Sequence, residues 1–120
     1  MEITNYNELE SHIGEVVLFS YGINGEEHVW MKKITNVLPP SYFAHDDNDI
    51  EILKKSIKHF FVYGVNNVLL KHKGKTEIKI LGEYNENRMS NAQEYARTPT
   101  KEEMKIYMNA LRKYRVFGNN

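Results

Sequence analysis

Glu15-Val-Val-Leu-Phe-Ser-Tyr-Gly-Ile-Asn-Gly-Glu-Glu-His-Val-Trp-Met-Lys-Lys-Ile-Thr-Asn-Val37 is the stretch that decides the fold of this chain. Two runs rich in β-branched and aromatic residues flank Asn24-Gly25, and these two residues tolerate the positive φ that both central positions of a type I′ turn require. The stretch therefore predicts a β-hairpin with a two-residue loop. That loop sets the register and places Phe19 opposite Trp30.

The predicted hairpin is apolar on both faces. Because side chains alternate between the faces of a strand, one face is aliphatic and the other is aromatic. The aliphatic face carries Val16, Leu18, Ser20, Val29 and Met31, and the aromatic face carries Phe19, Tyr21, His28 and Trp30. A hairpin with one wet face would alternate apolar and polar residues instead. Two interpretations follow: the rest of the fold covers both faces, or the aromatic face is an exposed binding platform.

Capping signals and apolar residues at helical spacing predict three helices. The first covers residues 5–13, where Asn5 or Asn7 caps the start and Gly14 ends the helix. The second covers about residues 47–59, where apolar residues recur every three or four positions and acids precede lysines.

The third helix is predicted over about residues 99–114. Two signals compete for its start. Thr98-Pro99 puts proline at the first helical position, whereas Thr100 and Glu103 have the spacing of a capping box. An apolar stripe follows the helix and comprises Met104, Tyr107, Met108, Leu111 and Tyr114.

Residues 60–84 predict three further strands, with breaks at Asn66-Asn67 and at the turn Lys73-Gly74-Lys75. Pro39-Pro40 ends the second strand of the hairpin, because proline cannot donate to the sheet ladder. The chain is therefore predicted to be one α+β domain over residues 1–120. Its expected architecture is a five-stranded antiparallel bent sheet or a small SH3-like barrel with the three helices, because closing a sheet removes exposed edges.

The composition argues against several classes of protein. There is no cysteine, so a disulfide framework and a thiolate metal site are excluded. The first residues lack the basic and apolar regions of a signal peptide. No apolar run approaches the ~20 residues that span a bilayer. We therefore expect a cytoplasmic protein that does not bind membranes.

The net charge is zero, but the two halves of the chain differ in sign. Residues 1–53 hold ten acidic side chains against two lysines, and residues 54–120 hold fourteen lysines and arginines against six glutamates. Three interpretations are open: the halves pack together and neutralise each other, one half is a nucleic-acid surface, or copies associate head to tail. The last would make the protein a homo-oligomer.

No pattern for catalysis or metal binding is present. The chain has no Gly-x-Ser-x-Gly motif. His45-Asp-Asp-Asn-Asp49 lacks the glycine and the distal glutamate of a calcium loop, and it is interpreted as a helix cap. The five histidines have no ligand spacing. No catalytic residue, metal site or cofactor is predicted, and we do not expect an enzyme.

Residues 85–97 are polar, lack a period and are predicted as a long loop of the kind that often has a function. Arginine forks bind phosphate, and asparagine amides bind base edges. The candidate binding residues are therefore those of the loop together with the aromatic face of the hairpin: Phe19, Tyr21, His28, Trp30, Arg88, Asn91, Tyr95 and Arg97. With the basic residues 71–75 this set also fits a single-stranded nucleic-acid-binding module.

The chain is rich in Asn, Lys, Tyr and Ile, and Glu94-Tyr-Ala-Arg-Thr-Pro-Thr-Lys-Glu-Glu-Met-Lys-Ile-Tyr107 has an Arg-x-x-Thr-x-x-Glu step before its last helix. In these features it resembles the small accessory proteins of large, AT-rich bacteriophages. The resemblance implies host takeover or an anti-defence role in the host cytoplasm. The expected function is a non-enzymatic inhibitor that sequesters a host protein, with a sponge for a nucleotide-derived messenger as the alternative.

Overall fold

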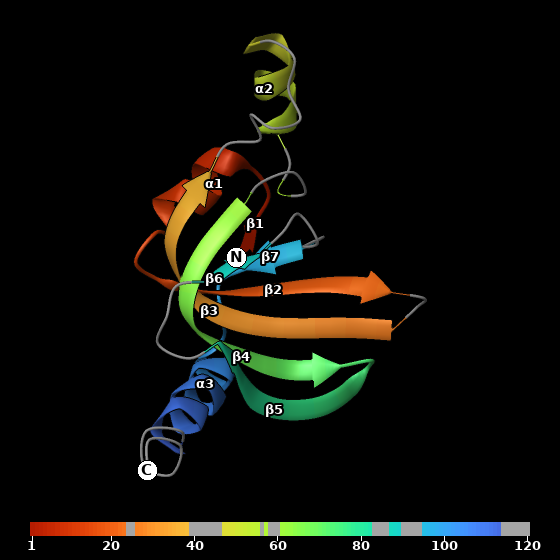
Figure 1. Cartoon of the computed structure of the whole chain (residues 1–120), viewed down its shortest axis with the longest axis vertical. Helices are drawn as coiled ribbons and strands as arrows, with labels where there is room; N and C mark the ends of the chain where they lie inside the picture. The colour runs from red at the N-terminus through yellow and green to blue at the C-terminus, as the bar shows by residue number, and fades with distance from the viewer. Residues whose placement is uncertain are drawn as a thin grey trace.

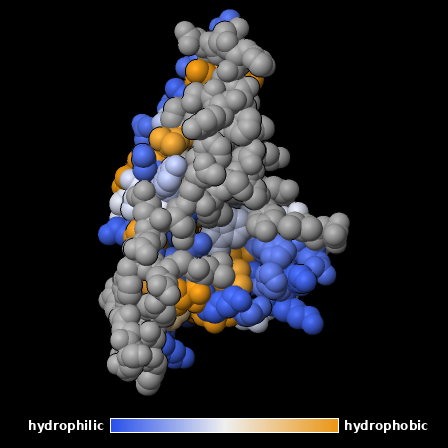
Figure 2. Space-filling view, viewed as in Figure 1, coloured by the Kyte–Doolittle hydropathy of each residue, from blue (hydrophilic) through white to orange (hydrophobic). Residues whose placement is uncertain are grey.

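The computed structural model describes residues 1–23, 26–38, 47–55, 57, 61–82, 87–89 and 95–113. These residues form an α+β fold that combines an antiparallel sheet with helices (Figure 1), and Figure 2 shows the same view as a space-filling surface coloured by hydropathy. In chain order the elements are β1 (Glu2–Ile3), α1 (Tyr6–Ser11), β2 (Val16–Ile23), β3 (Glu26–Leu38), α2 (Asp47–Leu53), β4 (Phe61–His72), β5 (Lys75–Gly82), β6 (Asn87–Met89), β7 (Tyr95–Arg97) and α3 (Lys101–Lys113).

The sheet has the strand order β1-β7-β2-β3-β4-β5, and β6 pairs with the first half of β4. The α+β class and the antiparallel sheet are thus confirmed. The prediction of a closed five-stranded barrel is wrong, because the described strands number seven and form an open sheet. Sequence spacing missed β1, β6 and β7, which are two or three residues long and too short to show a period of two.

The β2–β3 hairpin has the predicted register. Its pairs run from Val16 with Lys33 to Ile23 with Glu26, and Phe19 pairs with Trp30. The turn residues 24–25 lie outside the described residues. Strand β3 ends at Leu38, directly before the two prolines that were predicted to stop it.

Residues 61–72 form the single strand β4, whereas two strands with a break at Asn66-Asn67 were predicted. Asn66 has a φ of 54°, a conformation that asparagine adopts more readily than most residues. Register shifts near this point bend β4, so that its first half pairs with β6 and its second half with β5. The next turn is as predicted, because Lys73 and Gly74 have φ values of 51° and 77°, as a type I′ turn requires.

The predicted loop 85–97 contains β6 and β7, so the prediction that it lacks structure is wrong. Strand β7 lies between β1 and β2, with Ala96 paired to Ile3 on one side and to Phe19 on the other. Residues 83–86 and 90–94 lie outside the described residues. The central position of β7 explains why Ala96 is fully buried.

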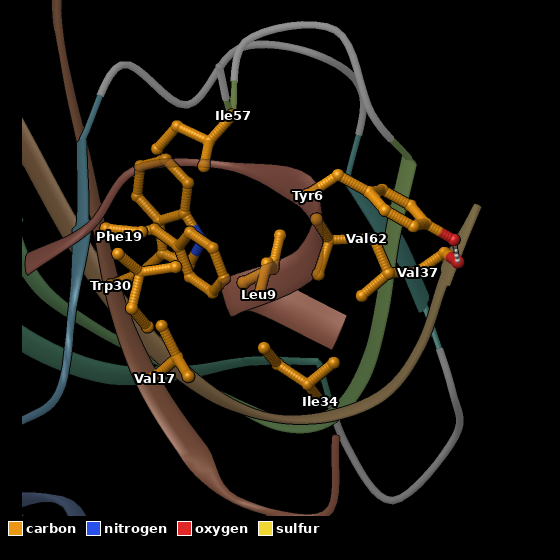
Figure 3. Packing of buried hydrophobic residues seen from close by; sticks show 11 residues of the cluster. Tyr6, Leu9, Val17, Phe19, Trp30, Ile34, Val37, Ile57 and Val62 are labelled. Atoms are coloured by element: carbon orange, nitrogen blue, oxygen red, sulfur yellow. Dashed lines mark hydrogen bonds between the residues drawn. The ribbon is translucent and has the colours of Figure 1, made fainter. Parts of the chain in front are cut away.

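Helices cover both faces of the sheet, which explains the two apolar faces of the hairpin. On one face, α1 packs over the first core, whose members are Ile3, Tyr6, Leu9, Val17, Phe19, Trp30, Ile34, Val37, Ile57, Val62 and Ala96 (Figure 3). On the other face, α3 packs over the second core, whose members are Leu18, Val29, Met31, Val68, Leu70, Tyr107 and Leu111. Burial of apolar side chains therefore stabilises the sheet from both of its faces.

The helix starts follow the capping signals. The side chain of Asn5 accepts a hydrogen bond of 2.9 Å from the Glu8 amide at the start of α1. Of the two signals that compete for the start of α3, the structure follows the capping box. The Glu103 N–H donates to the Thr100 hydroxyl, and the Thr100 N–H donates to the Glu103 carboxylate.

Helix α2 is shorter than the predicted 47–59, because it ends at Leu53. Of the residues that follow within that range, 56, 58 and 59 lie outside the described part, and the side chain of Ile57 lies in the first core. None of the described helices has the length and apolar character needed to cross a membrane.

Candidate functional site

Two of the predicted binding residues, Phe19 and Trp30, belong to the first core. Their side chains are 0% and 4% exposed, and their rings stack with centroids 6.0 Å apart and planes 18° apart. Figure 3 shows them among aliphatic side chains that include Leu9 and Ile57. Of the two interpretations of the aromatic face, the covered one fits these residues, and neither ring offers a surface for stacking a base.

His28 lies further toward the tip of the hairpin on the same face. It is buried, and its ring meets that of His72 on β4 edge to face, with centroids 4.9 Å apart. The backbone of Tyr21 pairs with that of His28. The Tyr21 side chain lies outside the described part of the structure.

Tyr95 and Arg97 lie on the opposite face of the sheet, because Ala96 between them points into the first core. The two terminal nitrogens of Arg97 donate to the two carboxylate oxygens of Glu103 at 2.6 Å each, and one also donates to the Thr98 carbonyl. This guanidinium is therefore engaged within the chain. Arg97 was predicted as a ligand-binding residue because no local pattern in the sequence indicates that β7 and the start of α3 meet.

The side chains of two further predicted binding residues, Arg88 and Asn91, are not described. Arg88 pairs through its backbone with Tyr63, but its side chain lies outside the described residues, and so does all of Asn91. The structure therefore places five of the eight predicted side chains. These five divide between two faces of the sheet rather than forming one site.

The Arg97–Glu103 pair sets the electrostatics where β7 meets α3. Hydrogen bonds from Arg97, opposed by partial burial and supported by the Thr100 amide, lower the pKa of Glu103 to about 2. The Glu103 carboxylate in turn raises the pKa of Arg97 above its ordinary value. Both side chains are less than a third exposed, so the pair is better shielded than most surface pairs.

Glu103→Gln is expected to lower the free energy of unfolding by about 2 kcal/mol near neutral pH, allowing for partial solvent screening. Glutamine also fits a capping box, so the substitution removes the charge and leaves the helix start intact. The folded pKa of Glu103 is about 2 and the ordinary value is 4.5. The stabilisation is thus present above pH 4.5 and is lost as the pH falls toward 2. Urea unfolding at several pH values measures both effects.

Glu102→Gln is the matched control. Glu102 pairs with Lys105 at 3.4 Å, but both side chains are more than two thirds exposed, so little change in stability is expected. Equal losses for the two variants, or an unchanged acid dependence in Glu103→Gln, would contradict the assigned role of Glu103.

A small cavity of about 180 Å³ opens on the same face as Arg97. Its floor is aliphatic, and two ion pairs lie at its rim: Arg97 with Glu103, and Glu27 with Lys71 at 3.6 Å. Its lining residues are Leu18, Ser20, Glu27, Val29, Leu70, Lys71, Tyr95, Arg97 and Glu103. Pockets for drug-sized ligands are roughly 300–1,000 Å³, so this cavity is too small to hold a nucleotide.

A larger open groove of about 620 Å³ follows α3. Its described lining is Pro99, Thr100, Lys101, Met104, Lys105, Met108 and Asn109. Met108 is 51% exposed, although the sequence placed it in the same apolar stripe as the buried Tyr107 and Leu111. The stripe is wider than the face that packs on the sheet. Sequence spacing gives the direction of the stripe but not the width of the contact.

The described residues show two further features that bear on chemistry. Burial is the main cause that raises the pKa of Tyr6 from 10.0 to about 12. Within the described ranges no cluster of three or more histidine, aspartate or glutamate side chains has the arrangement of a metal site.

Comparison with known proteins adds no functional information: no family model, curated protein or solved structure matches the chain.

Proposed function

We propose that this chain is a non-enzymatic protein-binding module and that the groove along α3 is its contact surface. The observation that carries the proposal is the exposure of Met108 on a helix fixed by the capping box and the second core. Methionine is common on surfaces that bind other proteins, because its flexible thioether adapts to the partner. A rigid helix that presents such side chains suits a peptide segment or a partner helix.

The charges beside the groove favour an acidic partner. Lys101 and Lys105 line it. Glu103 is already paired with Arg97, and Glu102 pairs with Lys105 at 3.4 Å, but both partners of that second pair are more than two thirds exposed. Arg112 and Lys113 extend the positive charge toward the end of α3. We therefore propose that the partner presents an acidic segment with apolar anchors, since complementary charge speeds and orients association.

We also propose, from the resemblance to bacteriophage accessory proteins, that this binding takes place in a host cell. We propose that the partner is a host protein, such as a defence protein, and that binding sequesters it. The described side chains give less support to a nucleotide sponge, because Phe19 and Trp30 are core residues and Arg97 is paired. A single-stranded nucleic-acid module would need exposed aromatic rings beside the basic β4–β5 turn. The rings of Phe19 and Trp30 are not exposed.

Met108→Glu is expected to weaken partner binding at least about tenfold, because it puts a charge in the apolar centre of the groove and repels an acidic segment. Ile78→Glu on β5 is the matched control, since Ile78 is 47% exposed and is not among the described residues that line the groove. Each variant is used to capture proteins from a bacterial lysate, and the captured proteins are quantified and chemically crosslinked to the bait.

The proposal holds if one protein is captured by the wild type and by Ile78→Glu, is lost with Met108→Glu, and crosslinks to Lys101 or Lys105 through an acidic segment. Capture that is equal for all three baits would overturn it. Light scattering of the unmixed chain distinguishes a second copy of the protein as the occupant, because self-association would then disappear in Met108→Glu.

A further inference from the structure

Helix α2 is acidic and carries an exposed apolar side chain. Its seven residues include Asp47, Asp49 and Glu51, and they include no lysine or arginine. The side chain of Ile52 on this helix is 63% exposed, more than any other described large apolar side chain except Met1. Burial of Ile52 would therefore have to come from another molecule.

The end of α2 is attached to the body of the molecule through Lys54. The Lys54 carbonyl accepts a 2.9 Å hydrogen bond from the Tyr6 amide, and its Nζ lies 5.2 Å from the centre of the Tyr6 ring. The same Nζ lies 3.8 Å from the carboxylate of Glu51, which is largely exposed, so this second pair is weak. Glu51 is thus able to exchange Lys54 for a lysine of another molecule.

The α3 groove is complementary to α2. Met108 at the groove is half exposed, and Lys101 and Lys105 lie beside it. Lys105 is held only by its exposed pair with Glu102. An acidic helix with one exposed isoleucine therefore meets both needs of the groove, an apolar anchor and negative charge.

The two elements lie too far apart to meet within one molecule, because Figure 1 shows α2 and α3 at opposite ends of its long axis. They also belong to the two oppositely charged parts of the chain, residues 1–53 and 54–120. We propose that α2 of one copy occupies the α3 groove of the next copy while the groove holds no other partner. This inference rests on the proposed function, because it uses the same groove.

Such a contact joins two different surfaces, so copies associate head to tail and form open chains or rings. Stable interfaces bury about 1,200–2,000 Å² in total, and a helix of seven residues offers much less. Self-association is therefore weak and reversible. It shields the apolar groove at high concentration, and a partner that binds more tightly displaces α2.

The test is sedimentation velocity of the full chain over a wide range of concentrations, at low and at high salt. Met108→Glu places a charge in the groove that repels the acids of α2. Ile52→Gln removes the apolar anchor, adds no charge and keeps a good helix former. Ile78→Gln is the matched control, because Ile78 is exposed but belongs neither to α2 nor to the described lining of the groove. Circular dichroism checks that each variant folds.

The wild type and Ile78→Gln are expected to gain mass as the concentration rises and to lose it as salt screens the charges. Ile52→Gln and Met108→Glu alone should each associate at least about tenfold more weakly. An equimolar mixture of these two variants should form dimers and nothing larger, because one intact α2 then meets one intact groove.

A wild type that stays monomeric at every concentration would overturn the proposal. So would association of Ile52→Gln equal to that of the wild type, or a mixture that forms no dimer. The proposed function is tested separately by capture from the lysate. Ile52→Gln keeps the groove and should capture the partner at least as well as the wild type, whether or not copies associate.

Discussion

Replacing Trp30 with alanine is expected to lower the free energy of unfolding by about 3–5 kcal/mol, which would leave little or no folded protein. Trp30 fills the first core between the sheet and α1, where it stacks on Phe19 and lies near Leu9 and Ile57 (Figure 3). Alanine would leave a cavity that the two fixed layers cannot close. Thermal and urea melts monitored by circular dichroism measure the loss.

Tyr95→Ala is the control for this prediction. Tyr95 is another aromatic residue of the predicted binding set, but it is exposed at the other face of the sheet, so a much smaller change is expected. Trp30 is the chain's single tryptophan, so its fluorescence also reports its environment directly. If Trp30→Ala is as stable as the wild type, or if a soluble quencher readily quenches Trp30 fluorescence, Trp30 is a surface residue and the prediction is wrong.

Gly64→Ala is expected to destabilise the fold by about 3 kcal/mol, the upper end for overpacking. A Cβ at this position would lie 2.7 Å from the Lys33 carbonyl oxygen and 2.8 Å from Cδ of Lys32. The Lys33 oxygen is backbone of the neighbouring strand and cannot move aside. Lys32 is fully buried, and its Nζ donates a 3.0 Å hydrogen bond to the Val62 carbonyl, so its stem is also fixed.

Gly22→Ala provides the matched control in β2. The nearest atom to an added Cβ there is the Glu26 carbonyl oxygen at 3.9 Å, an ordinary contact. Its free energy of unfolding should stay within about 1 kcal/mol of the wild type. Equal urea midpoints for the two variants would show that β3 and β4 approach each other less closely than the structure indicates.

The sequence predicted the elements whose signals are local. Asn24-Gly25 predicted the register of β2 and β3, Asn5 predicted the start of α1, and the spacing of Thr100 and Glu103 predicted the start of α3. Each of these signals acts over a few residues. No long-range contact is needed to interpret them.

Elements that depend on distant partners could not be predicted. Strands β6 and β7 are three residues each, so they have too few residues for a period and exist because β4 and β2 offer edges to pair with. Asn66 looked like a break between strands, but a bulge absorbs it and β4 continues. The barrel prediction failed for the same reason, since strand number and closure depend on these pairings.

The candidate site was predicted least well, because burial is decided by what packs on a residue. From the sequence, Phe19 and Trp30 fit both a core and a platform, and only the placement of α1 and Ile57 over them decides for the core. Arg97 has the signature of a ligand-binding residue until Glu103 is brought to it. The exposure of Met108 depends on which face of α3 is turned toward the sheet, and no local pattern in the sequence specifies that orientation.

Hydrogen–deuterium exchange of the chain, alone and saturated with the captured partner, tests the central claim of binding through α3 most directly. Residues 101–109 should gain protection in the complex, whereas the buried hairpin strands β2 and β3, protected already by the sheet, should change little. Protection gained at the β2–β3 hairpin with none along α3 would contradict the proposed contact surface.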